Sequence, residues 1–279
     1  MTSLRLLLAL SSKCDAEGKP RTVGKGTNDD MMLFHRQDPA AALGLLTRLP
    51  IRIDTEVAVE RGAKASWAYP LAGAVVGAIA AIAAGIALWL GLPETVAAAV
   101  ALAVQIVITG AMHEDGLADS ADGLWGGWTI DRRLEIMKDS RIGAYGVLAL
   151  GLALILRWSA LAAILPYAGW LWLPVVGALS RAPMPVLMAA LPNARANGLS
   201  RSVGRPGQET ILAGVAIAVV FALIGVGWAA FACIFWAGVV ATGCAVIAKA
   251  KIGGQTGDIL GATQQVTEIA VLCVLATQV

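Results

Sequence analysis

Long apolar runs separated by short polar segments dominate the chain from Ser66 onward. A helix needs about 20 mostly apolar residues to cross the hydrocarbon core of a bilayer. Because only closed hydrogen-bonded elements can span lipid, the pattern predicts an all-α, polytopic integral membrane protein with about seven transmembrane helices. The expected spans are residues 66–92, 94–112, 144–165, 168–191, 210–229, 230–248 and 261–279.

The composition supports a membrane protein over a soluble one. The chain is 58% hydrophobic and 14% charged, with a mean hydropathy of +0.73, whereas a typical soluble domain has about 25% charged residues. Residues 1–34 differ: they are polar, Gly-rich and without periodicity, which favours a disordered N-terminal extension. We therefore expect a single membrane-embedded domain over residues 35–279.

The distribution of basic residues predicts an orientation. Of the 21 Lys and Arg residues, only Arg157 and Arg181 fall inside expected spans. The others lie before residue 66 or in the loops 112–144, 192–209 and 249–258, and the alternate connections contain none. Since basic loops stay in the cytoplasm, the N-terminus is expected inside and the C-terminus outside.

The densest polar motif follows the second expected span and reads HEDGLADSADG from His113 to Gly123. Asp115, Asp119 and Asp122 stand at i, i+4 and i+7, so a helix places them on a single face. Three such carboxylates repel one another unless a cation neutralises them. Oxygen-only ligands favour a hard ion such as Mg²⁺ over zinc.

A second acidic face is expected shortly afterwards. The helix should continue through the first motif, turn at Gly126 and Gly127, and restart at Asp131 with DRRLEIMKDSR. Asp139 lies on this second helix, so the two faces can converge into a cage for one or two metal ions. Lys138 and Arg141 flank Asp139, and they either bind phosphate or only set the topology.

The segment GGQTGDILGATQQVTE, Gly253 to Glu268, supplies a further carboxylate on the same side of the membrane. Its glycines allow close backbone approach to a phosphate or metal, and Asp258 precedes a helix N-terminus that attracts anions. Glu268 lies roughly 15 Å further along that helix. It reaches the site only if the helix begins deep in the bundle.

Three other polar residues are interpreted separately. His113 is either a core or capping residue or else a base or ligand. Arg181 stands near the middle of a span that Pro183 and Pro185 should break, and a buried charge beside irregular backbone normally lines a cavity. Arg157 is expected either to snorkel or to form a structural pair.

These motifs resemble those of the cobalamin synthase (adenosylcobinamide-GDP ribazoletransferase) family. The resemblance depends on HEDGLADSADG, on LEIMKDSRIGAYG from Leu134, on TRLP from Thr47, on the SR pair at Ser180 and on GGQTGDILGA from Gly253. It extends from about Pro39 to Val279. The first two motifs in tandem are highly specific.

The resemblance implies a transferase that joins adenosylcobinamide-GDP to α-ribazole, or to its 5′-phosphate, and releases GMP. It also implies a multi-pass protein of the bacterial cytoplasmic (inner) membrane whose active site faces the cytoplasm. The partners would be these small molecules and the bilayer, with no nucleic acid, and the glycine-rich bundle makes a homodimer plausible.

Together, the motifs and this reaction give a set of expected site residues. The Mg²⁺ ligands would be Asp115, Asp119, Asp122, Asp139 and Asp258. The catalytic residues would be Asp119, Asp122, His113, Lys138 and Arg141. The substrate-binding residues would be Arg133, Arg181, Gln255 and Thr256.

Two alternatives remain from the sequence. A CDP-alcohol phosphotransferase would share Asp119, Asp122 and Gly123, but it requires Ala and Arg where this chain has Gly126 and Gly127. A membrane transporter would place acidic residues at the bilayer midplane in discontinuous helices. Here the acidic motif is expected at the cytoplasmic rim instead.

Overall fold

The computed structural model describes residues 32–167 and 169–279, so most of the expected N-terminal extension lies outside the described residues. Apart from an isolated bridge between Asn193 and Gln255, each regular element in these ranges is a helix. The α-helices are α2 (Asp38–Leu46), α3 (Thr55–Arg61), α4 (Tyr69–Trp89), α5 (Glu94–Thr109), α6 (Met112–Gly126), α7 (Ile130–Ile136), α8 (Ala144–Ile164), α9 (Leu173–Arg181), α10 (Pro183–Ala190), α11 (Leu199–Val203), α12 (Gln208–Val226), α13 (Ala229–Ile252) and α14 (Gly257–Ala276).

The predicted helical membrane bundle is confirmed. Six helical stretches are long and apolar enough to span a membrane, and a seventh span is added if the bent pair α5 and α6 counts as one. Helices α8, α12 and α13 expose large apolar side chains such as Leu152, Ile224 and Phe235, which suits contact with lipid. Helices α9 and α14 are mostly buried and form the centre of the bundle.

The second span differs from the expectation of a helix that continues straight into the acidic motif. Helix α6 is bent by 87° from α5. The break lies at Gly110 and Ala111, which both have positive φ values of 65° and 56°. Ala111 is the one non-glycine residue in the described ranges with such a φ, so the chain accepts local strain there.

The expected proline break in the fourth span is much milder than predicted. Pro183 and Pro185 remove backbone donors, but Ala182 keeps helical dihedral angles of −58° and −36°. Its backbone N–H still bonds to the Ala178 carbonyl oxygen at 3.3 Å. Helices α9 and α10 therefore form one continuous span, because proline is tolerated in the first turn of a helical segment.

The N-terminal helices pack against the bundle through one buried carboxylate. The Asp38 side chain accepts hydrogen bonds from Arg61 at 2.7 and 2.9 Å and from the Trp67 indole at 2.7 Å. Arg61 also donates to the carbonyl oxygens of Met32 and Leu33. These bonds hold the start of the described chain against η2, the 3₁₀ segment Gly62–Ala68 that leads into α4.

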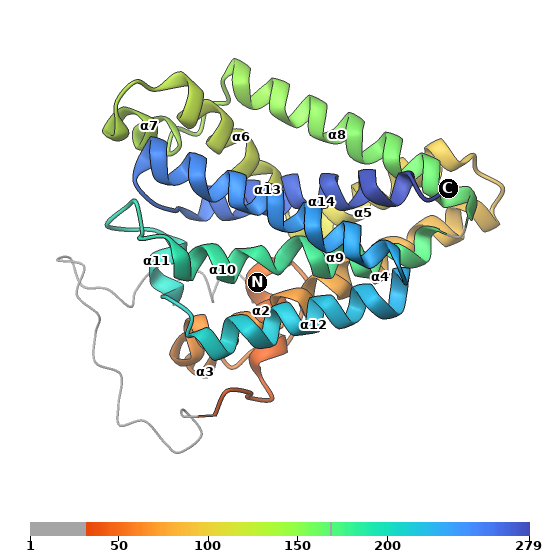
Figure 1. The fold of residues 1–279 in the computed structure, drawn as a ribbon, viewed down its shortest axis with the longest axis horizontal. Coiled ribbons are helices and arrows are strands. Elements are labelled where there is room, and N and C mark those ends of the chain that lie inside the picture. The colour runs from red at the N-terminus through yellow and green to blue at the C-terminus, as the bar shows by residue number, and fades with distance from the viewer. Residues whose placement is uncertain (1–31, 168) are drawn as a thin grey trace.

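Figure 1 shows α3, α7 and α11 at one end of the bundle and the C-terminus at the other. The polar loops that were expected to share one side of the membrane connect the elements at the first of these ends.

Helices α4 and α9 cross in backbone contact at paired glycines. A β-carbon on Gly73 would collide with the backbone of Gly177, and one on Gly177 would collide with Gly73. Small residues at such crossings let transmembrane helices approach closely, and van der Waals contact between them then stabilises the bundle.

We predict that Gly73→Ala destabilises the bundle by about 1–3 kcal/mol, because the added methyl group has no room between the two backbones. Gly151→Ala in α8 is the matched control, since its β-carbon meets nothing within 4 Å. Reversible unfolding in detergent, followed by helical circular dichroism, measures both variants. Equal stability of Gly73→Ala and the wild type would contradict the close crossing.

Candidate functional site

The close packing of α6 on α14 brings the first acidic motif beside the C-terminal one. A β-carbon on Gly116 would lie 2.8 Å from the backbone oxygen of Asp258. Asp119 interacts electrostatically with Asp115, Asp258 and Asp122, in decreasing order. The structure thus brings together four of the five predicted metal ligands.

Two of these carboxylates, Asp115 and Asp258, border a cleft of about 160 Å³ at the polar end of the bundle. We call it the acidic cleft. Its polar wall contains the side chains Asp115, Asn193, Arg195, Asn197, Ser200, Arg201, Gln255, Thr256 and Asp258. Carboxylates, amides and guanidinium groups in one cleft suit a ligand that is itself charged and bound together with a cation.

Arg195 is a site residue that the sequence analysis missed. Its guanidinium forms an ion pair with Asp258 at 2.9 Å and bonds to the Leu134 carbonyl oxygen at 3.3 Å. The residue belongs to the expected basic loop 192–209, but no spacing there distinguishes it from a topology-setting charge. Arg195 partly neutralises the cleft and places a phosphate-binding group beside the carboxylates.

The predicted substrate-binding residues Gln255 and Thr256 lie in the wall of the acidic cleft, and both have structural bonds. The Gln255 amide donates to Asn193 Oδ1 at 2.7 Å and accepts from the Ser200 hydroxyl at 2.8 Å. The Thr256 hydroxyl accepts from the Ile259 backbone N–H and caps α14. The segment before α14 is therefore fixed to the loop that contains Arg195.

Asp122 caps the next transmembrane helix. Its two carboxylate oxygens accept hydrogen bonds from the backbone N–H groups of Gly143 and Gly146 at 2.7 and 2.9 Å. Negative charge at a helix N-terminus is favourable because the first backbone donors there have no partners in the helix. Its predicted role as a metal ligand would have to coexist with these two bonds.

The second acidic face does not converge on the first as expected. Asp139 pairs with Arg141 at 2.8 Å on the exposed segment between α7 and α8, and the hydrogen bonds from Arg141 lower the pKa of Asp139 to about 2. Lys138 is exposed. Arg133 donates to the carbonyl oxygens of Gly127 and Lys251 at 2.9 and 2.7 Å, so it joins the α6–α7 turn to the end of α13.

The acidic cleft suits Mg²⁺ in its donor chemistry but is not a closed metal cage. Among the described residues, no three His, Cys, Asp or Glu side chains are arranged so that they could hold a metal ion. Mg²⁺ usually keeps several waters and binds through one or two carboxylates together with substrate phosphates. The neighbouring Asp115 and Asp119 fit that smaller requirement, with Asp258 next to them.

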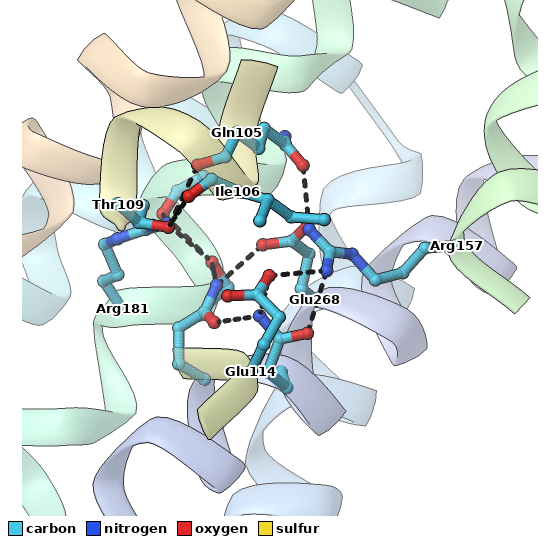
Figure 2. A network of polar contacts seen from close by, with 11 residues as sticks. Gln105, Ile106, Thr109, Glu114, Arg157, Arg181 and Glu268 are labelled. Carbon is cyan, nitrogen blue, oxygen red and sulfur yellow. Dashed lines mark hydrogen bonds and ion pairs between the residues drawn. The ribbon is translucent and has the colours of Figure 1, made fainter. Parts of the chain in front are cut away.

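Deeper in the bundle, polar side chains form what we call the buried charge network: Gln105, Glu114, Arg157, Arg181, Gln264, Gln265 and Glu268. Figure 2 labels Gln105, Glu114, Arg157, Arg181 and Glu268, which converge from α5, α6, α8, α9 and α14, respectively. Arg157 is 1% exposed and pairs with Glu114 at 2.9 Å and Glu268 at 2.8 Å. It also donates to the amide oxygens of Gln105 and Gln265, both at 2.9 Å.

The network answers three questions that the sequence left open. Arg157 is a structural pair and does not snorkel, and Glu268 is its partner at depth. Arg181 is buried in the same network, where it donates to Gly177 and Ser180 and interacts electrostatically with Glu268 and Glu114. Two arginines thus balance two glutamates. Glu114 was missed, although it stands inside the first motif, because its partners come from distant helices.

His113 lies in the first turn of α6. It is 1% exposed and packs near Gly261 of α14. Its Nε2 atom has no hydrogen-bond partner among the residues that the structure describes. This burial fits the interpretation as a core residue, while the unpartnered nitrogen leaves a ligand-binding role open to test.

We predict that Arg157→Met destabilises the folded protein by about 3–5 kcal/mol, because Glu114 and Glu268 would remain buried without their cation. Arg132→Met is the matched control, because it breaks an ion pair with Glu135 whose side chains are 60% and 70% exposed. That loss should be at most about 1 kcal/mol. Unfolding in detergent compares the two, and similar losses would contradict a dominant role for the buried pair.

Comparison of the sequence with known proteins places this chain in a family. A family model described as cobalamin-5-phosphate synthase matches residues 38–276. A protein of Bradyrhizobium diazoefficiens named adenosylcobinamide-GDP ribazoletransferase is 46% identical over 86% of this chain and 93% of its own. A Mesorhizobium japonicum protein of the same name is 43% identical over 85% and 92%, respectively.

No solved structure matches the chain. The sequence relatives nevertheless cover nearly all of the described bundle, including both acidic motifs and the segment before α14. They favour neither a CDP-alcohol phosphotransferase nor a transporter. The chain belongs to the cobalamin-5-phosphate synthase family.

Proposed function

We propose that this protein is an adenosylcobinamide-GDP ribazoletransferase, which joins adenosylcobinamide-GDP to α-ribazole or its 5′-phosphate and releases GMP. The observation that supports this most directly is the acidic cleft, formed where the motif of α6 meets the N-terminus of α14. Relatives at 41–46% identity have this activity in their names.

The reaction transfers one phosphoryl group. A ribose hydroxyl oxygen of α-ribazole bonds to the phosphorus on the cobinamide side of the diphosphate, and the bond from that phosphorus to the bridging oxygen breaks. GMP leaves with the bridging oxygen, and the hydroxyl proton passes to a base or to water. Negative charge spreads over the phosphoryl oxygens, so positioning and electrostatic stabilisation supply most of the catalysis.

Residues in the acidic cleft and the adjacent Asp119 would have different roles in this reaction. Asp115 and Asp119 would hold Mg²⁺ with oxygens of the diphosphate, next to Asp258. Bound there, the metal would neutralise charge on the transferred phosphoryl group. Arg195 and Arg201 line the same cleft and can bind the outer phosphate oxygens.

The other expected roles remain proposals with specific requirements. Asp139 can join the site only by exchanging its Arg141 partner, which would also release Arg141, beside Lys138, to neutralise the GMP leaving group. His113, Asp119 and Asp122 are the candidate bases, and Asp119 is the one that borders the other carboxylates without capping a helix. Arg181 would act from the buried charge network and not from the cleft wall.

We also propose that the protein lies in the bacterial cytoplasmic membrane with its acidic cleft facing the cytoplasm. The support is the concentration of Lys and Arg in the loops on the cleft side of the chain. That side gives soluble nucleotides direct access to the carboxylates. A homodimer is a further proposal, supported by the small residues along the spans.

We predict that Asp119→Asn lowers the rate of Mg²⁺-dependent GMP release by about 10²-fold or more, because an amide cannot replace the charge that binds the cation. The assay uses detergent-solubilised protein with adenosylcobinamide-GDP, α-ribazole and Mg²⁺, and follows GMP by chromatography. Asp131→Asn is the control, because Asp131 lies exposed in the first turn of α7.

The two possible failures are distinguishable. If the wild-type protein releases no GMP, the proposed reaction is wrong. If the wild type is active and Asp119→Asn keeps its full rate while inserting normally, the reaction stands but the acidic cleft is not its metal site.

A further inference from the structure

A second cavity of about 50 Å³ adjoins the acidic cleft. The two share Met112, Leu199, Ser200 and Gly257 in their walls, so they lie next to each other. We call the second cavity the methionine pocket. Its wall is made of Leu45, Leu46, Tyr69, Met112, His113, Met184, Met188, Leu199, Ser200, Val203, Gly257, Leu260 and Gly261.

The wall of the methionine pocket suits an aromatic ring. Met112, Met184 and Met188 come from two separate helices, α6 and α10, and methionine sulphur makes favourable contacts with aromatic rings. Methionine also has three rotatable bonds, so these side chains can move apart for a ligand larger than the present cavity. Tyr69 adds a buried aromatic surface from α4.

One polar atom in this wall is unsatisfied. His113 lines the pocket, and its buried Nε2 has no hydrogen-bond partner in the described part of the chain. The hydroxyl of Ser200 already donates to Gln255. Because an unpaired buried polar group costs free energy, a ligand with one matching ring nitrogen would bind here better than a hydrocarbon.

Given the proposed reaction, we infer that the methionine pocket binds the flat aromatic base of the ribazole substrate. The base would lie among the three methionines, with a ring nitrogen near His113. The ribose would then lie at the junction with the acidic cleft, beside Asp115, where its hydroxyl can meet the diphosphate. The pocket therefore separates the two substrates: the base enters the bundle, and the nucleotide diphosphate stays in the polar cleft.

Other parts of the substrates fit this pocket less well. Guanine has donors and acceptors on several edges, and most of them would be left unpaired against methionine and leucine. The corrin ring system is far too large for a cavity of about 50 Å³ that is lined by residues of α2, α4, α6, α10, α11 and α14. A two-ring base with methyl groups and a single free nitrogen matches both the apolar wall and the histidine.

We predict that Met188→Ala raises the KM for α-ribazole about tenfold and leaves the KM for adenosylcobinamide-GDP unchanged, because only the base loses contacts. Met188→Leu should restore most of the lost affinity. Val186→Ala is the matched control on the same helix, since Val186 lines a different apolar groove. Both KM values are obtained from GMP release in detergent.

Wild-type protein provides a second test that needs no substitution. Free 5,6-dimethylbenzimidazole should inhibit GMP release competitively against α-ribazole and not against adenosylcobinamide-GDP. Competition against adenosylcobinamide-GDP, no competition, or a Met188→Ala effect on the other KM would each overturn the assignment of the pocket. An inactive wild type would instead overturn the reaction on which this assignment rests.

Discussion

The pairing of charges in the apolar interior is the constraint on which the rest of this structure depends. An ionised side chain inside a bilayer is costly unless it finds an opposite charge and hydrogen bonds. Arg157 finds Glu114, Glu268 and two glutamine side chains, and these partners come from three other helices. One guanidinium group thereby fixes the depth and rotation of α5, α6, α8 and α14 relative to one another.

This arrangement explains how a broken span can present an acidic helix at the rim. The chain leaves α5 through two residues with positive φ, and Glu114 is bound to Arg157 within the first turn of α6. With Glu114 directed inward, the next residue, Asp115, faces the acidic cleft, and Asp119 follows one turn later.

Hydrophobic periodicity and motif spacing predicted the features that depend on local sequence. They did not predict the features that depend on contacts between helices far apart in the chain. The apolar runs predicted the spans, and the spacing of Asp115, Asp119 and Asp122 predicted a shared helical face. The 87° bend was not predicted, because Gly110 is one of many glycines in this chain. The pairing of Arg195 with Asp258 joins a loop to the first turn of α14, 63 residues later, and no local pattern encodes such a pair. The polar spacing of Gln264, Gln265 and Glu268 along one span was the available signal for the buried network.

The bonds from Asp122 to Gly143 and Gly146 make two distant motifs into one structural unit. A β-carbon at either glycine would collide with the carboxylate that caps α8. The glycines of RIGAYG are therefore required by an aspartate that stands about twenty positions earlier, and the aspartate is required by the unpaired amides of that later helix. The two motifs therefore fold as one unit: a larger residue at either glycine would displace the carboxylate, and loss of the carboxylate would leave the first amides of α8 without this partner.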